Sequence, residues 1–219
     1  MTTATTQTEK AYALLREKLM GGAFSPGQRL VNRQLATEFG LSVIPLREAI
    51  SRLASEGLVQ QIPGSGSFVR AADEREMEEL IAFRACIESG AAAEAALHIT
   101  NRQLLALEGH IEEWEEIAAK IAARSDKTAT KKQMQRWMEI EESFHSRIVE
   151  ASRNRFLADA SRDHQVLARF FDAEKKRTGL TSGDAEKTCR GHRKLVEVLR
   201  QGDPEAARLA MSRHLAGQG

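Results

Sequence analysis

The chain has 219 residues, which is enough for one large domain or two modest ones. With 42% hydrophobic and 29% charged residues, it is too apolar to be disordered and too mixed to be one long coiled coil. The formal net charge of +1 excludes binding to nucleic acid through bulk positive charge, so any DNA contact must depend on locally placed arginines.

The cysteine content and the distribution of apolar residues indicate the cellular compartment in which the protein is expected. Its two cysteines, Cys86 and Cys189, provide no disulfide framework, which is typical of a protein in a reducing cytoplasm. The first residues, MTTATTQTEK, lack the apolar core of a signal peptide. No run approaches the roughly 20 apolar residues that a membrane-spanning helix needs. We therefore expect a cytoplasmic protein without a membrane partner.

A first helix is predicted to stop at Gly21–Gly22, and the stretch 32–59 then indicates two short helices joined by a tight turn. Gly40 provides the positive-φ position that commonly ends a helix, and Ser42 occupies the N-cap position of the next one. This order is typical of a helix-turn-helix, whose second helix enters the major groove of DNA. An ordinary hairpin of two helices is the alternative.

The second of these helices, near residues 43–55, is predicted to be amphipathic, and the residues after it favour a DNA-binding unit. Leu46, Ile50 and Leu53 are expected to face inward, and Arg47 and Arg52 outward. Residues 58–62 and 67–70 then alternate like strands around the turn cluster 63–66. A β-hairpin in this place is the wing of a winged helix-turn-helix.

Beyond a linker at residues 71–75, the strand signals end. Amphipathic helices are expected at about 76–98, 101–124, 131–152, 154–177, 184–201 and 203–216. The fold class is therefore mostly α, with a winged helix-turn-helix domain at residues 1–74 and an all-α antiparallel bundle at residues 75–219.

Three histidines of the predicted bundle lie on apolar faces of separate helices. They are His145, His192 and His214, and Glu141 lies one turn before His145 on the same face. A single inward histidine is more often an ordinary core residue, but several buried imidazoles without partners are costly. A shared divalent cation removes that cost, and a donor set of three imidazoles and one carboxylate suits Zn, Ni, Co, Mn or Fe(II).

Other bundle residues have two interpretations. Arg84 is predicted on or near the inward face, where its guanidinium suits a ligand carboxylate, and the alternative is an ion pair with Glu88 at i+4. Cys189 either faces the metal or is a small core residue. His98, His110 and His164 are interpreted as ordinary residues, with His164 also a candidate for a pocket rim.

The segments GAFSPGQRL, RQLATEFGLS, PLREAISRLASEGLV and PGSGSFV closely resemble the DNA-binding domain of GntR-family transcriptional regulators. The resemblance implies that Arg33, Ser42, Arg47 and Gly66 contact DNA, and the exposed Arg52 is a further candidate. The chain departs from the family's pattern after the turn, where Val43 and Ile44 replace the usual Arg and Ser or Thr. These two side chains offer only apolar contacts, for instance to a thymine methyl.

The bundle resembles the FCD effector domain of the FadR subfamily. The resemblance rests on Arg84-x-x-x-Glu88, Glu141-x-x-x-His145, Gly191-His192, Gly202-Asp203 and His214-Leu215. It implies a divalent metal held by Glu141, His145, His192 and His214, where the family more often has Asp in place of Glu141. A small organic acid then binds beside the metal, with Arg84 as a candidate contact. Six helices suggest the VanR-like variant.

The resulting hypothesis is a ligand-controlled transcription factor, a repressor that acts as a homodimer on double-stranded operator DNA. The competing hypothesis is a metal-dependent enzyme that carries a helix-turn-helix-like domain, with Glu142 as a base. The sequence contains no recognisable nucleophile motif or oxyanion loop, so a non-enzyme is expected.

Overall fold

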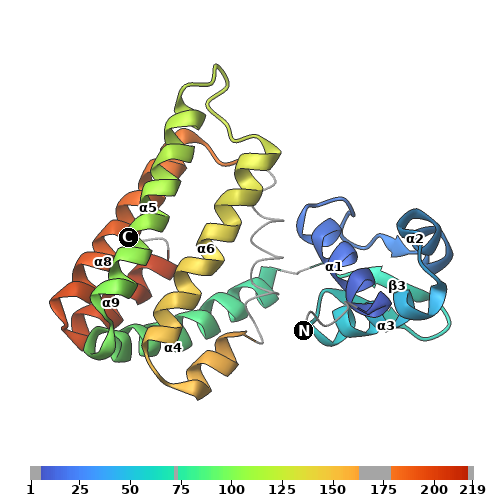
Figure 1. The fold of residues 1–219 in the computed structure, drawn as a ribbon, viewed down its shortest axis with the longest axis horizontal. Helices are drawn as coiled ribbons and strands as arrows, with labels where there is room; N and C mark the ends of the chain where they lie inside the picture. The colour runs from blue at the N-terminus through green and yellow to red at the C-terminus, as the bar shows by residue number, and fades with distance from the viewer. Residues whose placement is uncertain (1–5, 72–73, 163–178, 217–219) are drawn as a thin grey trace. The chain divides into compact units, whose positions relative to one another are not determined.

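The computed structural model describes residues 6–71, 74–162 and 179–216 (Figure 1). The chain divides into two compact units, and it passes from the first to the second after Glu74. Within the described ranges, no helix is both long enough and apolar enough to cross a membrane.

The first unit is a winged helix-turn-helix. Its elements are α1 (Gln7–Met20), β1 (Arg29–Leu30), α2 (Asn32–Phe39), α3 (Val43–Ser55), β2 (Val59–Ile62) and β3 (Gly66–Val69) (Figure 1). The strands form an antiparallel sheet in the order β1-β3-β2, with Gln60 opposite Phe68 and Ile62 opposite Gly66. The hairpin of β2 and β3 is the predicted wing.

The turn between α2 and α3 follows from local residue chemistry. Gly40 ends α2 in the left-handed conformation, with φ of 64°. Ser42 stands at the N-cap position of α3, but its side chain makes no capping hydrogen bond, which differs from the usual role of serine there. Leu46, Ile50 and Leu53 are at most 1% exposed, which confirms the predicted inward face of α3.

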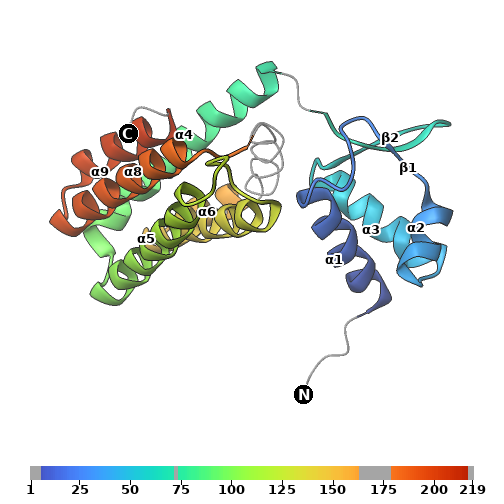
Figure 2. The same cartoon turned by 90° about the horizontal axis from the view of Figure 1, so that it is seen from above.

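The second unit is a bundle of antiparallel helices. They are α4 (Glu74–His98), α5 (Asn101–Ala122), α6 (Lys131–Ala151), α8 (Ser182–Gln201) and α9 (Pro204–Leu215), and residues 155–162 are also helical. Both α6 and α8 pack against α5, and α9 packs against α8 (Figures 1 and 2). The helix predicted at 154–177 is described only up to residue 162, and its remainder lies outside the described residues.

Capping residues determine where the bundle helices begin and end. Helix α8 begins at Ser182, two residues earlier than predicted, because Thr181 and Asp184 form a reciprocal capping box. Gly202 then ends α8 with φ of 73°, and the Asp203 side chain accepts hydrogen bonds from the first backbone N–H groups of α9. These two residues produce the tight turn that brings α9 back along α8.

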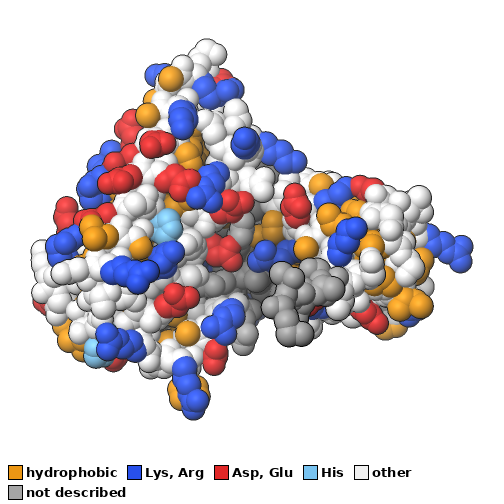
Figure 3. Space-filling model, in the orientation of Figure 1, with side chains coloured by type: hydrophobic (Ala, Val, Ile, Leu, Met, Phe, Trp, Pro, Cys, Tyr) orange, Lys and Arg blue, Asp and Glu red, His pale blue; other side chains and the backbone are white. Residues whose placement is uncertain are grey.

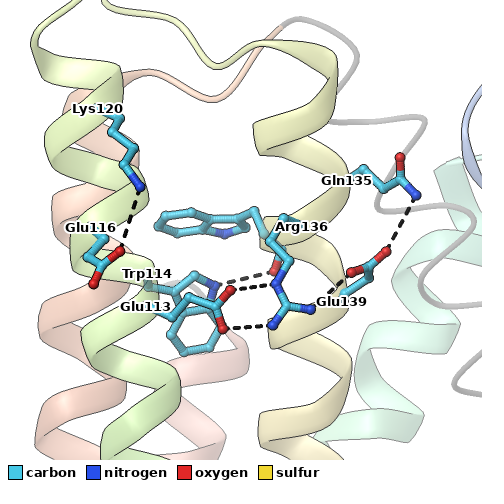
Figure 4. A network of polar contacts seen from close by, with 8 residues as sticks. Glu113, Trp114, Glu116, Lys120, Gln135, Arg136 and Glu139 are labelled. Carbon is cyan, nitrogen blue, oxygen red and sulfur yellow. Dashed lines mark hydrogen bonds and ion pairs between the residues drawn. The ribbon is translucent and has the colours of Figure 1, made fainter.

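Large aromatic side chains fill the centre of the bundle. Trp114 of α5 is fully buried, and its indole N–H donates to the backbone carbonyl of Trp137 of α6 at 3.3 Å. On the outside of the same two helices, the Arg136 guanidinium donates two hydrogen bonds to the Glu113 carboxylate. It also forms an ion pair with Glu139 (Figure 4). A buried aromatic contact and an exposed ion network therefore join α5 to α6.

The surface of the bundle carries mixed charge. Ion pairs link α5 and α8, with Arg193 paired to Glu115 and Arg200 to Glu108. Figure 3 shows acidic and basic side chains interspersed over the helical unit on the face in view. This side of the unit therefore presents no extended field of one sign that would attract a polyanion.

We expect the two links between α5 and α6 to differ in their contribution to stability. Trp114→Ala should lower the free energy of unfolding by about 3–5 kcal/mol, because it removes a fully buried ring and leaves a cavity. Arg136→Ala should lower it by about 1 kcal/mol or less, because that side chain is 50% exposed and the pair is screened by water. Urea titration of both variants measures the difference, and equal losses would contradict this account of the core.

Candidate functional site

Four side chains from three helices converge in the bundle. Glu141 and His145 come from α6, His192 from α8 and His214 from α9. One ligand atom from each lies within 4.8 Å of those of the other three. The His192 and His214 ring centroids are 4.2 Å apart, and that of His145 lies 5.6 Å from the first and 5.4 Å from the second. The structure thus brings together all four residues that the sequence singled out.

Helix geometry places the Glu141 carboxylate beside two buried imidazoles. Glu141 and His145 are one turn apart and share a face of α6, so that Glu141 Oε1 lies 3.5 Å from His145 Nε2. Glu141 Oε2 lies 3.7 Å from His192 Nε2. The two histidines are at most 2% exposed, whereas the Glu141 side chain is 20% exposed. One carboxylate therefore faces two imidazoles that water hardly reaches.

The Nδ1 atoms of the two buried histidines have partners elsewhere. His145 Nδ1 lies 2.6 Å from Glu88 Oε2 of α4, and His192 Nδ1 lies 2.8 Å from the carbonyl oxygen of Thr188. Both partners are acceptors, so each Nδ1 carries the proton and donates it. The opposite nitrogen of each ring, Nε2, lies on the side of Glu141. His145 Nε2 is buried without a hydrogen-bond partner among the described residues.

Burial and neighbouring charges shift the pKa values of the groups in and around the cluster, in opposite directions for Glu88 and His145. Burial by itself would raise the pKa of Glu88, but the positive charges of His145 and Arg84 lower it below its usual range. Burial would likewise lower the pKa of His145, yet Glu88 and Glu141 raise it. For His214, burial and the neighbouring His192 and His145 lower the pKa to about 3, so its imidazole is neutral at pH 7.

Glu88 contacts the histidine cluster, and sequence reasoning missed this contact. The spacing predicted its pairing with Arg84 but gave no sign of His145, which lies 57 positions later in the chain. The signal available was its position in an apolar stretch of α4, where a carboxylate that is 2% exposed requires partners.

Arg84 forms the ion pair that the sequence left open as an alternative. Its Nε donates to Glu88 Oε1 at 2.8 Å, and its side chain is 19% exposed. The other oxygen of Glu88 accepts a hydrogen bond from His145. The Glu88 carboxylate therefore connects the Arg84 guanidinium to the histidine cluster. Its contact with an effector stays a prediction.

The remaining candidates of the bundle lie outside this cluster. Cys189 is buried in a groove between α5 and α8 with Ala118 and Arg193, and burial raises the pKa of its thiol to about 11. His110 packs edge-on against Phe144. His98 is half-buried at the end of α4. His164 lies outside the described residues.

The predicted DNA contacts of α2 and α3 are accessible. Arg33 at the start of α2 and Arg47 in the second turn of α3 are exposed, as is Ser42 in the turn. Val43 and Ile44 open α3, and they are 36% and 71% exposed. Large apolar side chains at the start of this helix are therefore presented to solvent in the described structure.

Two further predicted DNA contacts also have structural partners. The Arg52 guanidinium lies 3.8 Å from the centre of the Tyr12 ring and pairs with Glu56. Gly66 has φ of 121°, and a Cβ there would lie 3.1 Å from the side chain of Arg29. The positive φ accounts for glycine at position 66, and the contacts with Tyr12 and Glu56 account for arginine at position 52. A role of either residue in DNA binding stays a prediction.

Comparisons with known proteins cover almost the whole chain. Residues 7–69 match the family described as bacterial regulatory proteins, gntR family, and residues 79–217 match the FCD domain. The chain is 27% identical over 205 residues to the uncharacterized HTH-type transcriptional regulator YdhC of Bacillus subtilis (strain 168), covering 93% of this chain and 85% of that protein. It is 25% identical over 207 residues to the HTH-type transcriptional repressor RspR of Escherichia coli (strain K12), covering 94% and 85%.

The fold has a counterpart among solved structures. Escherichia coli McbR/YncC superposes with a TM-score of 0.78 at 21% identity, over 98% of this chain and 95% of that one. The two family matches together span both units of the structure, in the order that the sequence predicted. The chain belongs to the GntR family of bacterial regulatory proteins and is a transcriptional regulator with a C-terminal FCD domain.

Proposed function

We propose that this regulator is a repressor whose affinity for its operator is controlled by a small carboxylate bound beside a divalent metal in the FCD domain. The observation that carries the proposal is the convergence of Glu141, His145, His192 and His214, with one ligand atom of each within 4.8 Å of the others. Such a meeting of polar side chains in a bundle core is costly unless a shared partner satisfies them.

The residues present fit a transition metal. Three imidazole nitrogens and one carboxylate oxygen form a donor set that suits Zn, Ni, Co, Mn or Fe(II). His145 Nε2 is a buried nitrogen without a hydrogen bond among the described residues. The lowered pKa of His214 leaves its ring neutral at pH 7, as a ligand must be, whereas His145, whose pKa the two carboxylates raise, would release its Nε2 proton when the cation binds. When bound, the cation would supply a Lewis-acidic position to which an anionic ligand attaches.

Arg84 supports an acidic effector. Its guanidinium is largely buried, and Glu88 fixes it in the same part of the bundle as His145. A planar guanidinium binds carboxylates through parallel hydrogen bonds. An organic acid that contacts both Arg84 and the cation would bind one state of the bundle better than another, and this difference in affinity is what allows a ligand to shift DNA binding.

The exposed residues of α2 and α3 support operator binding. Helix-turn-helix regulators usually act as dimers on two-fold symmetric sites, and we propose a homodimer in the cytoplasm for this chain. Repression is favoured by the similarity to RspR, which is named as a repressor. Arg47 is proposed to bind a base or phosphate from the exposed face of α3.

Val43 and Ile44 define the proposed sequence preference. An Arg at such a position reads guanine through two hydrogen bonds, and neither side chain here can do so. Ile44 is 71% exposed, so most of its apolar side chain is available for contact with DNA. The methyl group of thymine is the apolar feature of the major groove, and we propose that these residues read it.

Metal content tests the proposed cluster. His192→Ala should greatly reduce the metal that copurifies with the protein, because it removes one of four converging donors. Elemental analysis by mass spectrometry measures the change. His98→Ala is the matched control, since His98 is a histidine of the same unit outside the cluster. Equal metal in both variants would remove His192 from the site.

Arg47 tests the DNA-binding face. Arg47→Ala should weaken binding to a selected operator by about 1–3 kcal/mol, the typical contribution of an arginine that contacts a base. The thermal unfolding temperature should not change, because the side chain is exposed. Fluorescence anisotropy with labelled DNA measures the affinity, and Arg102→Ala on the exposed face of α5 is the control. Unchanged affinity would contradict the assignment of α3 as the recognition helix.

The thymine preference has a test that changes one methyl group. We would select operators from random DNA and then replace each thymine by uracil, which lacks only the 5-methyl. One or more replacements should weaken binding about fourfold, as expected for a buried methyl worth about 0.8 kcal/mol. In Ile44→Ala at least one of these replacements should lose its effect, because the side chain that contacts that methyl group is gone. Selected sites in which uracil binds the unmodified protein as tightly as thymine would exclude this mode of reading.

A further inference from the structure

Glu88 is a buried carboxylate that is divided between two partners. Its Oε1 accepts from Arg84 Nε at 2.8 Å, and its Oε2 accepts from His145 Nδ1 at 2.6 Å. The residue is 2% exposed and lies in the middle of α4, a helix that contributes none of the four clustered ligand atoms. Burying a carboxylate is costly, and Arg84 and His145 are the partners that offset this cost.

The bond to His145 has a defined consequence for the imidazole ring. A carboxylate acceptor requires a proton on Nδ1, so Nε2 is the nitrogen that loses its proton when the ring binds a cation, and the lone pair is then on Nε2. That atom is turned toward Glu141, with 3.5 Å between Nε2 and Oε1. A carboxylate behind a histidine also makes the opposite nitrogen a stronger donor to a cation.

The comparison with His192 shows that the two buried histidines are held differently. His192 Nδ1 donates to the neutral carbonyl oxygen of Thr188 in its own helix, four residues earlier. His145 instead depends on a charged group from another helix. Its orientation therefore follows the placement of α4, and α4 also carries Arg84.

We propose that Glu88 is a positioning residue that orients His145 toward the cation and joins Arg84 to the metal centre. The inference rests on the proposed metal function, and it adds a residue that contacts neither the cation nor DNA. An anion that binds Arg84 alters the hydrogen bond between Arg84 and Glu88. This change in Glu88 then alters its hydrogen bond to His145. Metal and anion binding are then coupled, and each must change the affinity of the other by the same factor.

The test uses the full-length protein, stripped of metal and titrated with Co²⁺ alone. Co²⁺ reports its ligands through its visible absorption spectrum, so the titration yields both an affinity and a signature of ligand placement. Glu88→Gln retains the size of the side chain and removes its charge. We expect roughly 10- to 100-fold weaker Co²⁺ binding and an altered visible spectrum. Glu94→Gln, which makes the same change at an exposed carboxylate of the same helix, should match the unmodified protein in both.

The outcomes separate this inference from the proposed function. Failure of the unmodified protein to bind Co²⁺ overturns the metal site and the role of Glu88 with it. Tight binding that Glu88→Gln leaves unchanged in affinity and spectrum overturns the role of Glu88 alone. Circular dichroism of each variant without metal shows whether the bundle is folded.

A second measurement applies if Glu88→Gln does not fold. In the unmodified protein labelled with ¹⁵N-histidine and loaded with Zn²⁺, magnetic resonance should show the remaining proton of His145 on Nδ1, and the Nε2 resonance should be shifted from its position without metal. A proton on Nε2 of the neutral ring, or a shift at Nδ1 on adding Zn²⁺, would overturn the proposal. This experiment requires no substitution at Glu88.

Discussion

The helical unit is organised around a polar group that a bundle core does not normally tolerate. Glu88, His145 and His192 are each at most 2% exposed, and they lie among the aromatic rings of the core. Such groups destabilise a fold unless each is matched by a partner. Glu88 and Thr188 satisfy the Nδ1 atoms, and the Nε2 atoms face Glu141. The proposed cation would complete this arrangement, because it would bind the Nε2 atoms and the Glu141 carboxylate together.

The two units differ in where their candidate functional side chains lie: they are mostly buried in the bundle and exposed on α3. In the bundle, the contacts among ionisable groups are short, buried and directed by helices on several sides. In the winged helix-turn-helix, Ile44 and Arg47 project from a helix whose other face is tightly packed by Leu46 and Leu53. Rigid packing beneath and exposed side chains above are what a helix needs to read a DNA groove.

Most helices and the four clustered residues could be predicted from the sequence. The features that could not be predicted depend on contacts between distant parts of the chain or on unrecognised capping residues. Periodicity placed Leu46, Ile50 and Leu53 inward, and the spacing of Glu141 and His145 put them on one face, because both are local properties of a helix. The contact between Glu88 and His145 depends on how α4 packs near α6, which no local pattern encodes. The start of α8 was misplaced by two residues because the capping role of Thr181 was not recognised.

The central claim is that one cation joins imidazoles from α6, α8 and α9. The most direct measurement is an anomalous difference map from crystals of the protein grown with Zn²⁺ and collected on both sides of the zinc absorption edge. The account predicts one strong peak about 2.0–2.2 Å from Glu141, His145, His192 and His214. A map without a peak among these four residues, or with the zinc bound elsewhere on the chain, would contradict it.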